Sequence, residues 1–341
     1  MNRSITQGTV AHNSAEHRNL FWLLIALFAV ALLAFFTGRY PAPGFVAPTL
    51  IAEDELAVQL LFNLRLPRLL ASLVLGMSLG AAGMVFQMLF SNPLVEPGFL
   101  GVSQGAAFGA AFCIVFLSGN AVAVQGLAML FALVGLALSY LIAQRIHFGG
   151  WVLRLVLAGI TVSALFSAAL GLLKYMADPI SQLPEITFWL LGSLSSVTWP
   201  KFLVIMPAVL LSLLVLFLFR WRINVLSLDD ETAFSLGTAP RRERLVLLAV
   251  AVLATASVVS IAGMVGWVGL IVPHLARRLF GSNTELSLPA SILVGGIFAV
   301  ICDTLARTLL PGEIPLGILT SLIGAIIFLL LMTSSRFQVQ R

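Results

Sequence analysis

The sequence predicts an all-α, polytopic membrane protein with about ten transmembrane helices, and three observations support this class. Of the 341 residues, 60% are hydrophobic and only 10% are charged, whereas soluble domains carry roughly 25% charged residues. Apolar runs as long as a bilayer core, about 20 residues, recur along the whole chain. Most connections between the runs are short, so we expect one membrane domain and no separate soluble domain.

The apolar runs predict ten spans. They cover residues 20–38, 66–90, 98–118, 121–143, 152–176, 199–220, 245–264, 265–280, 286–309 and 314–333. The seventh and eighth spans form one continuous run, which glycines and Pro273 are expected to bend back on itself. A polar N-terminal tail over 1–19, a ten-helix domain over 20–335 and a short tail over 336–341 complete this division.

Lysine and arginine indicate which side of the membrane each connection occupies, because they accumulate on cytoplasmic segments. If the N-terminus lies inside, 13 of the 19 Lys and Arg residues fall on inner segments and 6 on outer segments. We therefore expect both termini in the cytoplasm. The sequence AGMV occurs at 82–85 and again at 262–265, which fits a possible inverted repeat, although chance similarity is an equal alternative.

Several functions find no support in the sequence. The basic residues are scattered over helix ends and form no continuous patch for nucleic acid. Cys113 and Cys302 sit in apolar runs without metal-ligand spacing. Paired carboxylates, His clusters, nucleophile constellations and phosphate-binding loops are missing as well. We expect no catalytic residue, no metal and no cofactor in this chain, so ATP, if used, binds a separate chain.

Charged residues near the outer surface have two interpretations each. Arg65 and Arg68, in RLPR, and Arg307 are either snorkelling anchors or a cationic rim that docks an acidic partner. Asp303 lies inside an apolar run with Arg307 four residues later on the same helix face. It is either part of an ion pair that holds the last two spans together or a proton relay.

Other polar positions lie at chain breaks and helix ends. The segment Asn92-Pro93-Leu94 breaks the chain at the inner end of the second span, as a gate or as an ordinary turn. His274 is expected to cap a helix or lie at the membrane interface, with a ligand or proton-carrier role as the alternative. Arg277 is expected to anchor its helix at the headgroups, and the segment around Glu313 and Pro315 marks an outer turn.

Two longer polar loops remain. The outer loop 177–198 is expected to hold a short surface helix, and the inner segment 221–244 carries SLDDETAFSLGTAPRRER. In the inner segment we expect two short helices joined near Gly237, with Asp229, Asp230 and Glu231 capping the first helix. Such an element would dock another protein, whereas the alternative is a solvated loop.

Six motifs in order resemble one family. They are RLPR, NPLVEPGFLG, LAGI, FWLLGSL, VGLIVPHLARRLFG and GEIPLGILTSLIGA, from 65 to 331. They are similar to the permease subunits of the iron-siderophore, haem and vitamin B12 class of ABC importers, the type II importers. The resemblance implies a permease domain over 20–335 that pairs with a second copy or paralogue, two cytoplasmic ATPase subunits and a periplasmic or lipid-anchored binding protein. It also implies a bacterial or archaeal cytoplasmic membrane, with lipid and not nucleic acid around the chain.

The resemblance further implies roles for single residues. Binding-protein docking falls on Arg65, Arg68 and Arg307; ATPase coupling on Asp230, Glu231, Ala233, Leu236 and Gly237; and the inner gate on Asn92, Pro93 and Leu94. The remaining motif positions, with structural roles, are Pro273, His274, Arg277, Asp303, Glu313 and Pro315. The start of the fifth span also belongs to the family's inner gate, but Trp151-Val152-Leu153 is apolar and bulky here.

The expected function is therefore the translocation pathway of an ATP-driven importer for a metal chelate. Ferric siderophore is the leading cargo, with haem, cobalamin and a molybdate-type oxyanion behind it. The alternatives are an ion-coupled secondary transporter that uses Asp303 and, with less support, a membrane enzyme.

Overall fold

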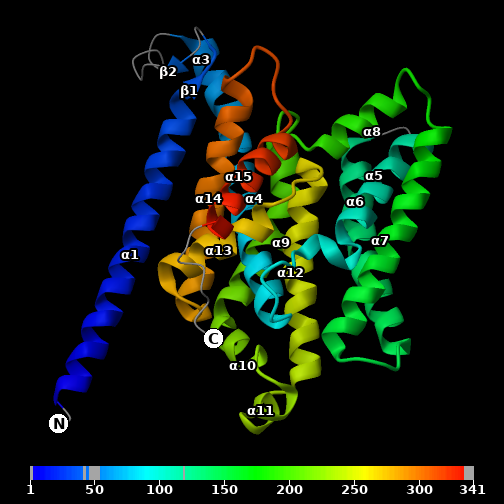
Figure 1. The fold of residues 1–341 in the computed structure, drawn as a ribbon. Helices are drawn as coiled ribbons and strands as arrows, with labels where there is room; N and C mark the ends of the chain where they lie inside the picture. Colours follow the sequence, from blue (N-terminus) through cyan, green and yellow to red (C-terminus); the bar gives the residue numbers. More distant parts are fainter. Residues whose placement is uncertain (1–2, 41–43, 46–53, 118–119, 334–341) are drawn as a thin grey trace.

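The structure, a computed structural model, describes residues 3–40, 44–45, 54–117 and 120–333, and the predicted tail 336–341 lies outside these residues. The long helices are α1 (Arg3–Phe36), α4 (Leu66–Leu89), α6 (Ala121–Arg145), α7 (Trp151–Met176), α9 (Trp199–Leu218), α12 (Pro240–Ala262), α14 (Thr284–Thr308) and α15 (Leu316–Thr333). These eight are long and apolar enough to cross a membrane. The shorter α5 (Val102–Phe116) and α13 (Val268–Phe280) occupy the predicted third and eighth spans. The predicted all-α polytopic class is thereby confirmed (Figure 1).

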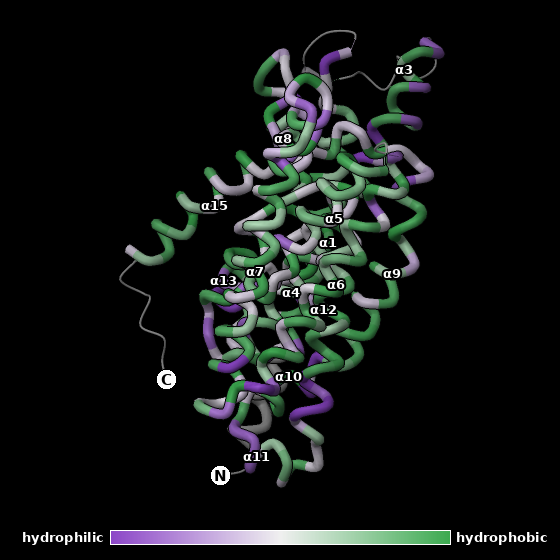
Figure 2. The backbone as a smooth tube through the Cα atoms, turned by 90° about the vertical axis from the view of Figure 1, so that its right-hand side faces the viewer, coloured by the Kyte–Doolittle hydropathy of each residue, from purple (hydrophilic) through white to green (hydrophobic). Residues whose placement is uncertain are grey.

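Short elements gather at the two ends of the bundle (Figure 1). One end holds α3 (Glu55–Gln59), the π-helical turn η1 (Leu60–Arg65), the antiparallel pair β1 (Thr37–Gly38) and β2 (Gly44–Phe45), and the predicted surface helix α8 (Gln182–Leu191). The other end holds α10 (Arg220–Leu226) and α11 (Asp230–Ser235). Figure 2 shows hydrophilic residues mainly near these ends and hydrophobic residues between them. The two predicted long polar loops therefore lie on opposite sides.

Helix α4 lies at the centre and packs against α12, α13 and α14. Small residues allow this close packing, because without a hydrophobic driving force helices in lipid associate through close van der Waals contact. A Cβ atom built on Gly76 would lie 1.9 Å from the carbonyl oxygen of Gly295 in α14. One turn further on, Ser291 Oγ donates to the carbonyl oxygen of Gly80 at 2.8 Å.

Gly76→Val is expected to destabilise the fold by about 3 kcal/mol, because the added side chain would force α4 and α14 apart. The measurement is the thermal unfolding midpoint in detergent. Gly126→Val in α6 is the matched control, since nothing lies within 4 Å of a Cβ atom built there. Equal midpoints for the two variants would contradict the packing role of Gly76.

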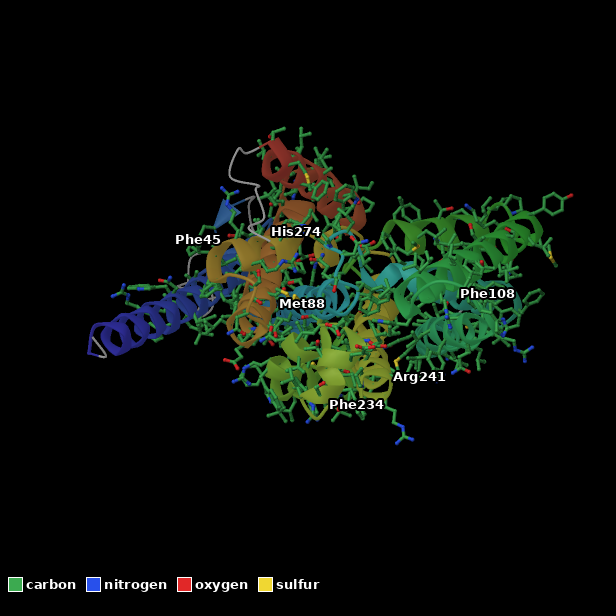
Figure 3. The ribbon with its side chains drawn as sticks, turned by 60° about the horizontal axis from the view of Figure 1, so that its bottom comes forward. Phe45, Met88, Phe108, Phe234, Arg241 and His274 are labelled. Atoms are coloured by element: carbon green, nitrogen blue, oxygen red, sulfur yellow. The ribbon has the colours of Figure 1, made fainter. Side chains whose placement is uncertain are left out.

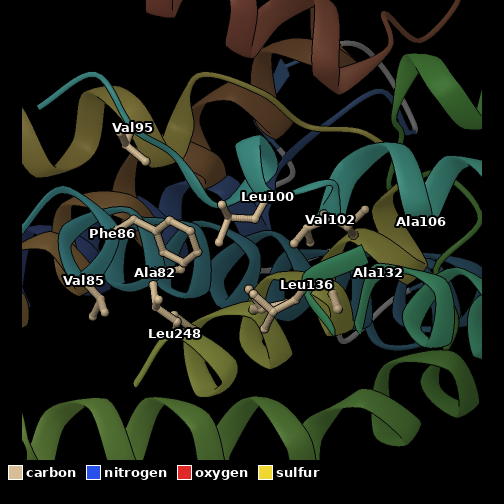
Figure 4. Packing of buried hydrophobic residues seen from close by; sticks show 14 of the residues in the cluster. Ala82, Val85, Phe86, Val95, Leu100, Val102, Ala106, Ala132, Leu136 and Leu248 are labelled. Atoms are coloured by element: carbon tan, nitrogen blue, oxygen red, sulfur yellow. The ribbon is translucent and has the colours of Figure 1, made fainter. Parts of the chain in front are cut away.

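After α4 the chain turns back into the protein interior, which is why α5 is short. The 3₁₀ turn η2 (Pro97–Leu100) carries Leu100, whose side chain is fully buried among Phe86, Val102 and Leu136 (Figure 4). Ser139 Oγ donates to the carbonyl oxygen of Leu100 at 2.9 Å. This non-helical backbone at membrane depth is thus enclosed by protein, as its unpaired polar groups require.

The seventh and eighth predicted spans are separated by an extended segment over 263–267, as the glycines there led us to expect. Gly263 ends α12 with φ +71°, and Trp267 precedes α13 with the same left-handed φ of 71°. The two AGMV copies adopt different conformations, because the first lies inside α4 and the second leaves α12.

Candidate functional sites at the two ends of the bundle

At the end that carries α8, four charged side chains form what we call the outer charge cluster: Arg68, Asp303, Arg307 and Glu313. Arg68 Nε donates to both carboxylate oxygens of Asp303 at 2.9 and 3.2 Å, and its Nη1 donates to Glu313 Oε1 at 2.7 Å. The side chains of Arg68 and Asp303 are only 12% and 4% exposed. The cluster therefore joins α4, α14 and the turn before α15.

The expected ion pair between Asp303 and Arg307 is present, but it is the longer of the two ion pairs that Asp303 makes. Arg307, at the i+4 position, approaches Asp303 Oδ2 only to 3.8 Å, because its guanidinium also donates to the carbonyl oxygens of Ala34 and Thr37 at the end of α1. The close ion pair is instead with Arg68, from a different helix. Asp303 thus holds α14 to α4 rather than to α15.

Arg65 lies beside the outer charge cluster without an ion pair to it among the described residues. Its guanidinium packs over Gly38, where a Cβ atom would lie 1.9 Å from Nη2, and within the described part of the chain it donates one hydrogen bond, of 3.5 Å, to the carbonyl oxygen of Phe35. Of the three arginines predicted to dock a binding protein, Arg65 is therefore the least committed to internal partners.

At the opposite end, the predicted gate residues form an exposed turn directly after α4. Asn92 Oδ1 accepts from the backbone N–H of Leu94 at 2.9 Å, which fixes the turn. Pro93 lies between them, and Ser91 adopts a left-handed φ of 48°. Ser91 Oγ donates to the carbonyl oxygen of Ser227 at 3.3 Å, so the turn contacts the connection between α10 and α11.

Two polar residues of α13 face protein rather than headgroups. Arg277 does not point to the membrane surface as expected; it turns inward and donates to Gln87 Oε1 of α4, with Met84 Sδ at 3.5 Å. His274 is buried, as a structural residue would be, with Nδ1 2.7 Å from the carbonyl oxygen of Leu270. Pro273 is buried within the same helix.

We call α10 and α11 with their connections, residues 220–239, the coupling element. The two helices are joined at 227–229 and not near Gly237, which instead follows α11 with φ +79°. Asp229 caps α11 by accepting from the backbone N–H of Thr232 at 2.9 Å, and hydrogen bonds from Thr232 lower the pKa of Asp229. Ala233 is fully buried, whereas Glu231 is exposed.

The tip of the coupling element is apolar. Phe234 is 72% exposed and Leu236 is 60% exposed, and Figure 3 shows Phe234 on the part of the molecule that comes forward in that view. Sequence reasoning named Leu236 but missed Phe234. An exposed aromatic on a short, capped helix is typical of a protein-binding surface.

A cavity of about 530 Å³ lies deeper in the bundle, where η2 meets α5, α7, α12 and α13. Polar side chains on its wall are Glu96, Ser103, Gln104, Ser163 and Thr255. The motif NPLVEPGFLG, which the sequence singled out, thus supplies both the exposed turn and part of this wall. Glu96 was not named from the sequence, because it lies in a polar connection rather than in an apolar run.

A bundle of membrane-length apolar helices with a buried return loop and short helices at both ends is typical of a transport protein of the permease class. The sequence profile of the FecCD transport family matches residues 17–334. The molybdate import system permease MolB of Haemophilus influenzae is 39% identical over 321 residues, covering 91% of this chain and 93% of that protein. The hemin transport permease HmuU of Yersinia pestis is 39% identical over 281 residues, covering 81% and 84%.

A solved structure gives the same result. It is described as an inward-facing conformation of a metal-chelate type ABC transporter, and it matches with a TM-score of 0.86 and 38% identity over 92% of this chain and 98% of that one. The chain belongs to the FecCD transport family, and the family resemblance inferred from the six motifs is confirmed.

Proposed function

We propose that this chain is the permease subunit of an ATP-binding-cassette importer and forms the pathway for a metal chelate delivered by a binding protein. The observation that carries the proposal is the contact between the exposed turn at Asn92–Leu94 and the coupling element, through Ser91 and Ser227. A gate that touches a protein-docking element can respond to a motor outside the membrane. The sequence itself holds no phosphate-binding loop, so the motor is a separate ATPase.

The proposed assembly has two permeases, two ATPase subunits and one binding protein in a bacterial or archaeal cytoplasmic membrane. The coupling element faces the cytoplasm, because Arg220, Arg222, Arg241, Arg242 and Arg244 gather at that end. The ATPase contacts are Asp230, Glu231, Leu236 and Gly237, with Ala233 fixing α11 from inside. Both termini lie on the same, cytoplasmic side.

Docking of the binding protein is proposed at the opposite end, through Arg65 together with Arg68 and Arg307. Arg65 has no carboxylate partner among the described residues, so it supplies the excess positive charge at this end. Arg68 and Arg307 are balanced by the carboxylates of Asp303 and Glu313, and would take part in docking by exchanging one of these partners for an acidic group of the binding protein. Such charge steers an acidic partner more than it adds affinity.

The proposed cargo is a chelate rather than a bare cation. The cavity of about 530 Å³ offers hydroxyl, amide and carboxylate groups but no cage of charged ligands. Relatives of this chain are named for molybdate and for hemin. Ferric siderophore remains our leading cargo, with haem, cobalamin and molybdate-type oxyanions as the other candidates.

The contacts of Asp303 argue against the alternative of an ion-coupled secondary transporter. A proton relay needs a carboxylate that can release its partners, but Asp303 is held by two hydrogen bonds from Arg68 and lies close to Arg307. A buried pair of this kind is costly to break. We therefore assign Asp303 a structural role.

The test is uptake into vesicles that contain the permease, its ATPase and the binding protein, with radioactive ferric chelate and radioactive molybdate as probes. Uptake is expected with ATP and should stop completely when hydrolysis by the ATPase is blocked. A proton or sodium gradient alone should drive none. Continued import with hydrolysis blocked would falsify the proposed function.

A further inference from the structure

Arg244, at the start of α12, fixes the coupling element from inside. Its side chain is 5% exposed. Nε donates to the carbonyl oxygen of Leu226 at 2.9 Å, Nη2 donates to that of Leu228 at 2.8 Å, and Nη1 forms an ion pair with Asp230, the first residue of α11. The N–H groups of one guanidinium thus bind three neighbouring residues of the coupling element.

The same guanidinium also lies over a ring of a different helix. The Arg244 carbon Cζ lies 4.9 Å from the ring centroid of Trp151, the first residue of α7. The Trp151 ring in turn packs against Phe90 with centroids 5.3 Å apart. Phe90 directly precedes Ser91, whose hydroxyl contacts the coupling element. Arg244, Trp151 and Phe90 therefore form a continuous chain of contacts between the coupling element, α7 and the gate turn, which we call the contact chain.

The contact chain links the start of α7 to the coupling element at a place where α7 has few other neighbours. The main neighbours of α7 are α5, α6 and η2. Beside Trp151 a cavity of about 400 Å³, lined also by Tyr140, Arg154 and Leu248, opens between α7 and α12. The start of α7 thus has space to move, and the contact chain runs along the cavity, since Trp151 and Arg244 both line it.

We propose that Arg244 is the positioning residue through which movement of the coupling element reaches the start of α7, with Trp151 as the receiving side chain. This inference rests on the proposed function. A planar guanidinium can donate from its edge and stack with its face at the same time, so displacement of α11 carries Arg244 against the Trp151 ring. Lysine offers charge but neither the fork nor the flat face.

The experiment uses the complete reconstituted complex with radioactive ferric chelate as the transported probe. Trp151→Leu is expected to bind the ATPase and hydrolyse ATP at the unaltered basal rate, while chelate imported per ATP falls about tenfold. Arg244→Lys should show the same fall in import per ATP, and its binding of the ATPase is measured alongside because Arg244 also holds α11. The two changes together should cost no more than either alone, because they interrupt one connection.

Arg222→Lys is the matched control. Arg222 also joins α10 to α12, through an ion pair with Glu243 at 2.6 Å, and also lies over a tryptophan, Trp221, at 5.5 Å. Unlike Arg244, it stacks on a residue of its own helix and not on α7. Import per ATP is expected to stay within about twofold of the unaltered complex.

A second measurement follows α7 itself. Leu153 is exposed near the start of α7, and the native cysteines Cys113 and Cys302 are buried, so Leu153→Cys can carry a spin label. The distance between the labels of the two permeases should change on ATP binding in the parent and stay fixed in Trp151→Leu. A merely structural role for the tryptophan would not abolish this change.

Unchanged import per ATP in Trp151→Leu, or losses that multiply in the combined variant, would overturn the proposal. If Arg244→Lys does not assemble, Trp151→Leu decides, since it leaves every bond within the coupling element intact. A complex without these changes that shows no ATP-driven uptake would contradict the proposed function instead.

Discussion

Arg68→Met is expected to lower the free energy of unfolding by about 3–5 kcal/mol, because it leaves a buried carboxylate without its close partner. Asp303 would retain only Arg307 at 3.8 Å, which is too distant to replace two hydrogen bonds. Equilibrium unfolding in mixed micelles measures the loss. Arg68→Met combined with Asp303→Leu should recover most of it, because no buried charge is then left unpaired.

Arg65→Glu tests docking of the binding protein separately from the structural role of Arg68. Within the described residues Arg65 makes one long hydrogen bond, so the unfolding free energy is expected to change by less than about 1 kcal/mol. Stimulation of the ATPase by the binding protein should nevertheless be lost, with basal hydrolysis unchanged. The opposite pattern, in which Arg68→Met stays stable but loses stimulation, would make Arg68 the docking residue and the outer charge cluster dispensable.

Most predicted spans agree closely with the helices because span length depends on local composition alone. The predicted polar tail 1–19 is a difference, because α1 already begins at Arg3 and includes most of it. The third span is the informative exception: it was predicted over 98–118, but α5 begins at Val102. The first residues of that run, 98–100, belong to η2. Apolar composition does not distinguish a helix from irregular backbone that is buried against other helices, and here Ser139 and Gly135 enclose it.

The outer charge cluster shows a second limit. The sequence offers Arg307 as the partner of Asp303, because helical periodicity brings i and i+4 together. Arg68 lies 235 positions away, and only the glycine contact of α4 with α14 places it within reach. Likewise, Arg277 next to Arg278 is typical of a headgroup anchor, yet the packing of α13 on α4 turns Arg277 toward Gln87.

Phe234→Glu is expected to weaken binding of the ATPase by about 2 kcal/mol or more, about 30-fold in Kd. Phe234 is the most exposed large hydrophobic residue of the coupling element, at 72%, and it stands on a helix that Asp229 caps and Arg244 fixes. Little flexibility is therefore lost on binding, and the buried aromatic surface contributes its full hydrophobic free energy. Binding of purified ATPase to permease in nanodiscs measures the change.

The control is Phe148→Glu, in the connection between α6 and α7 on the same side, where the ring is 65% exposed. It carries the same change of charge and apolar area but lies outside the coupling element, so ATPase binding should stay within about twofold. Equal losses in both variants would mean that the ATPase covers the whole face. A loss confined to Phe234 would place the motor on the coupling element, from which Arg244 reaches α7.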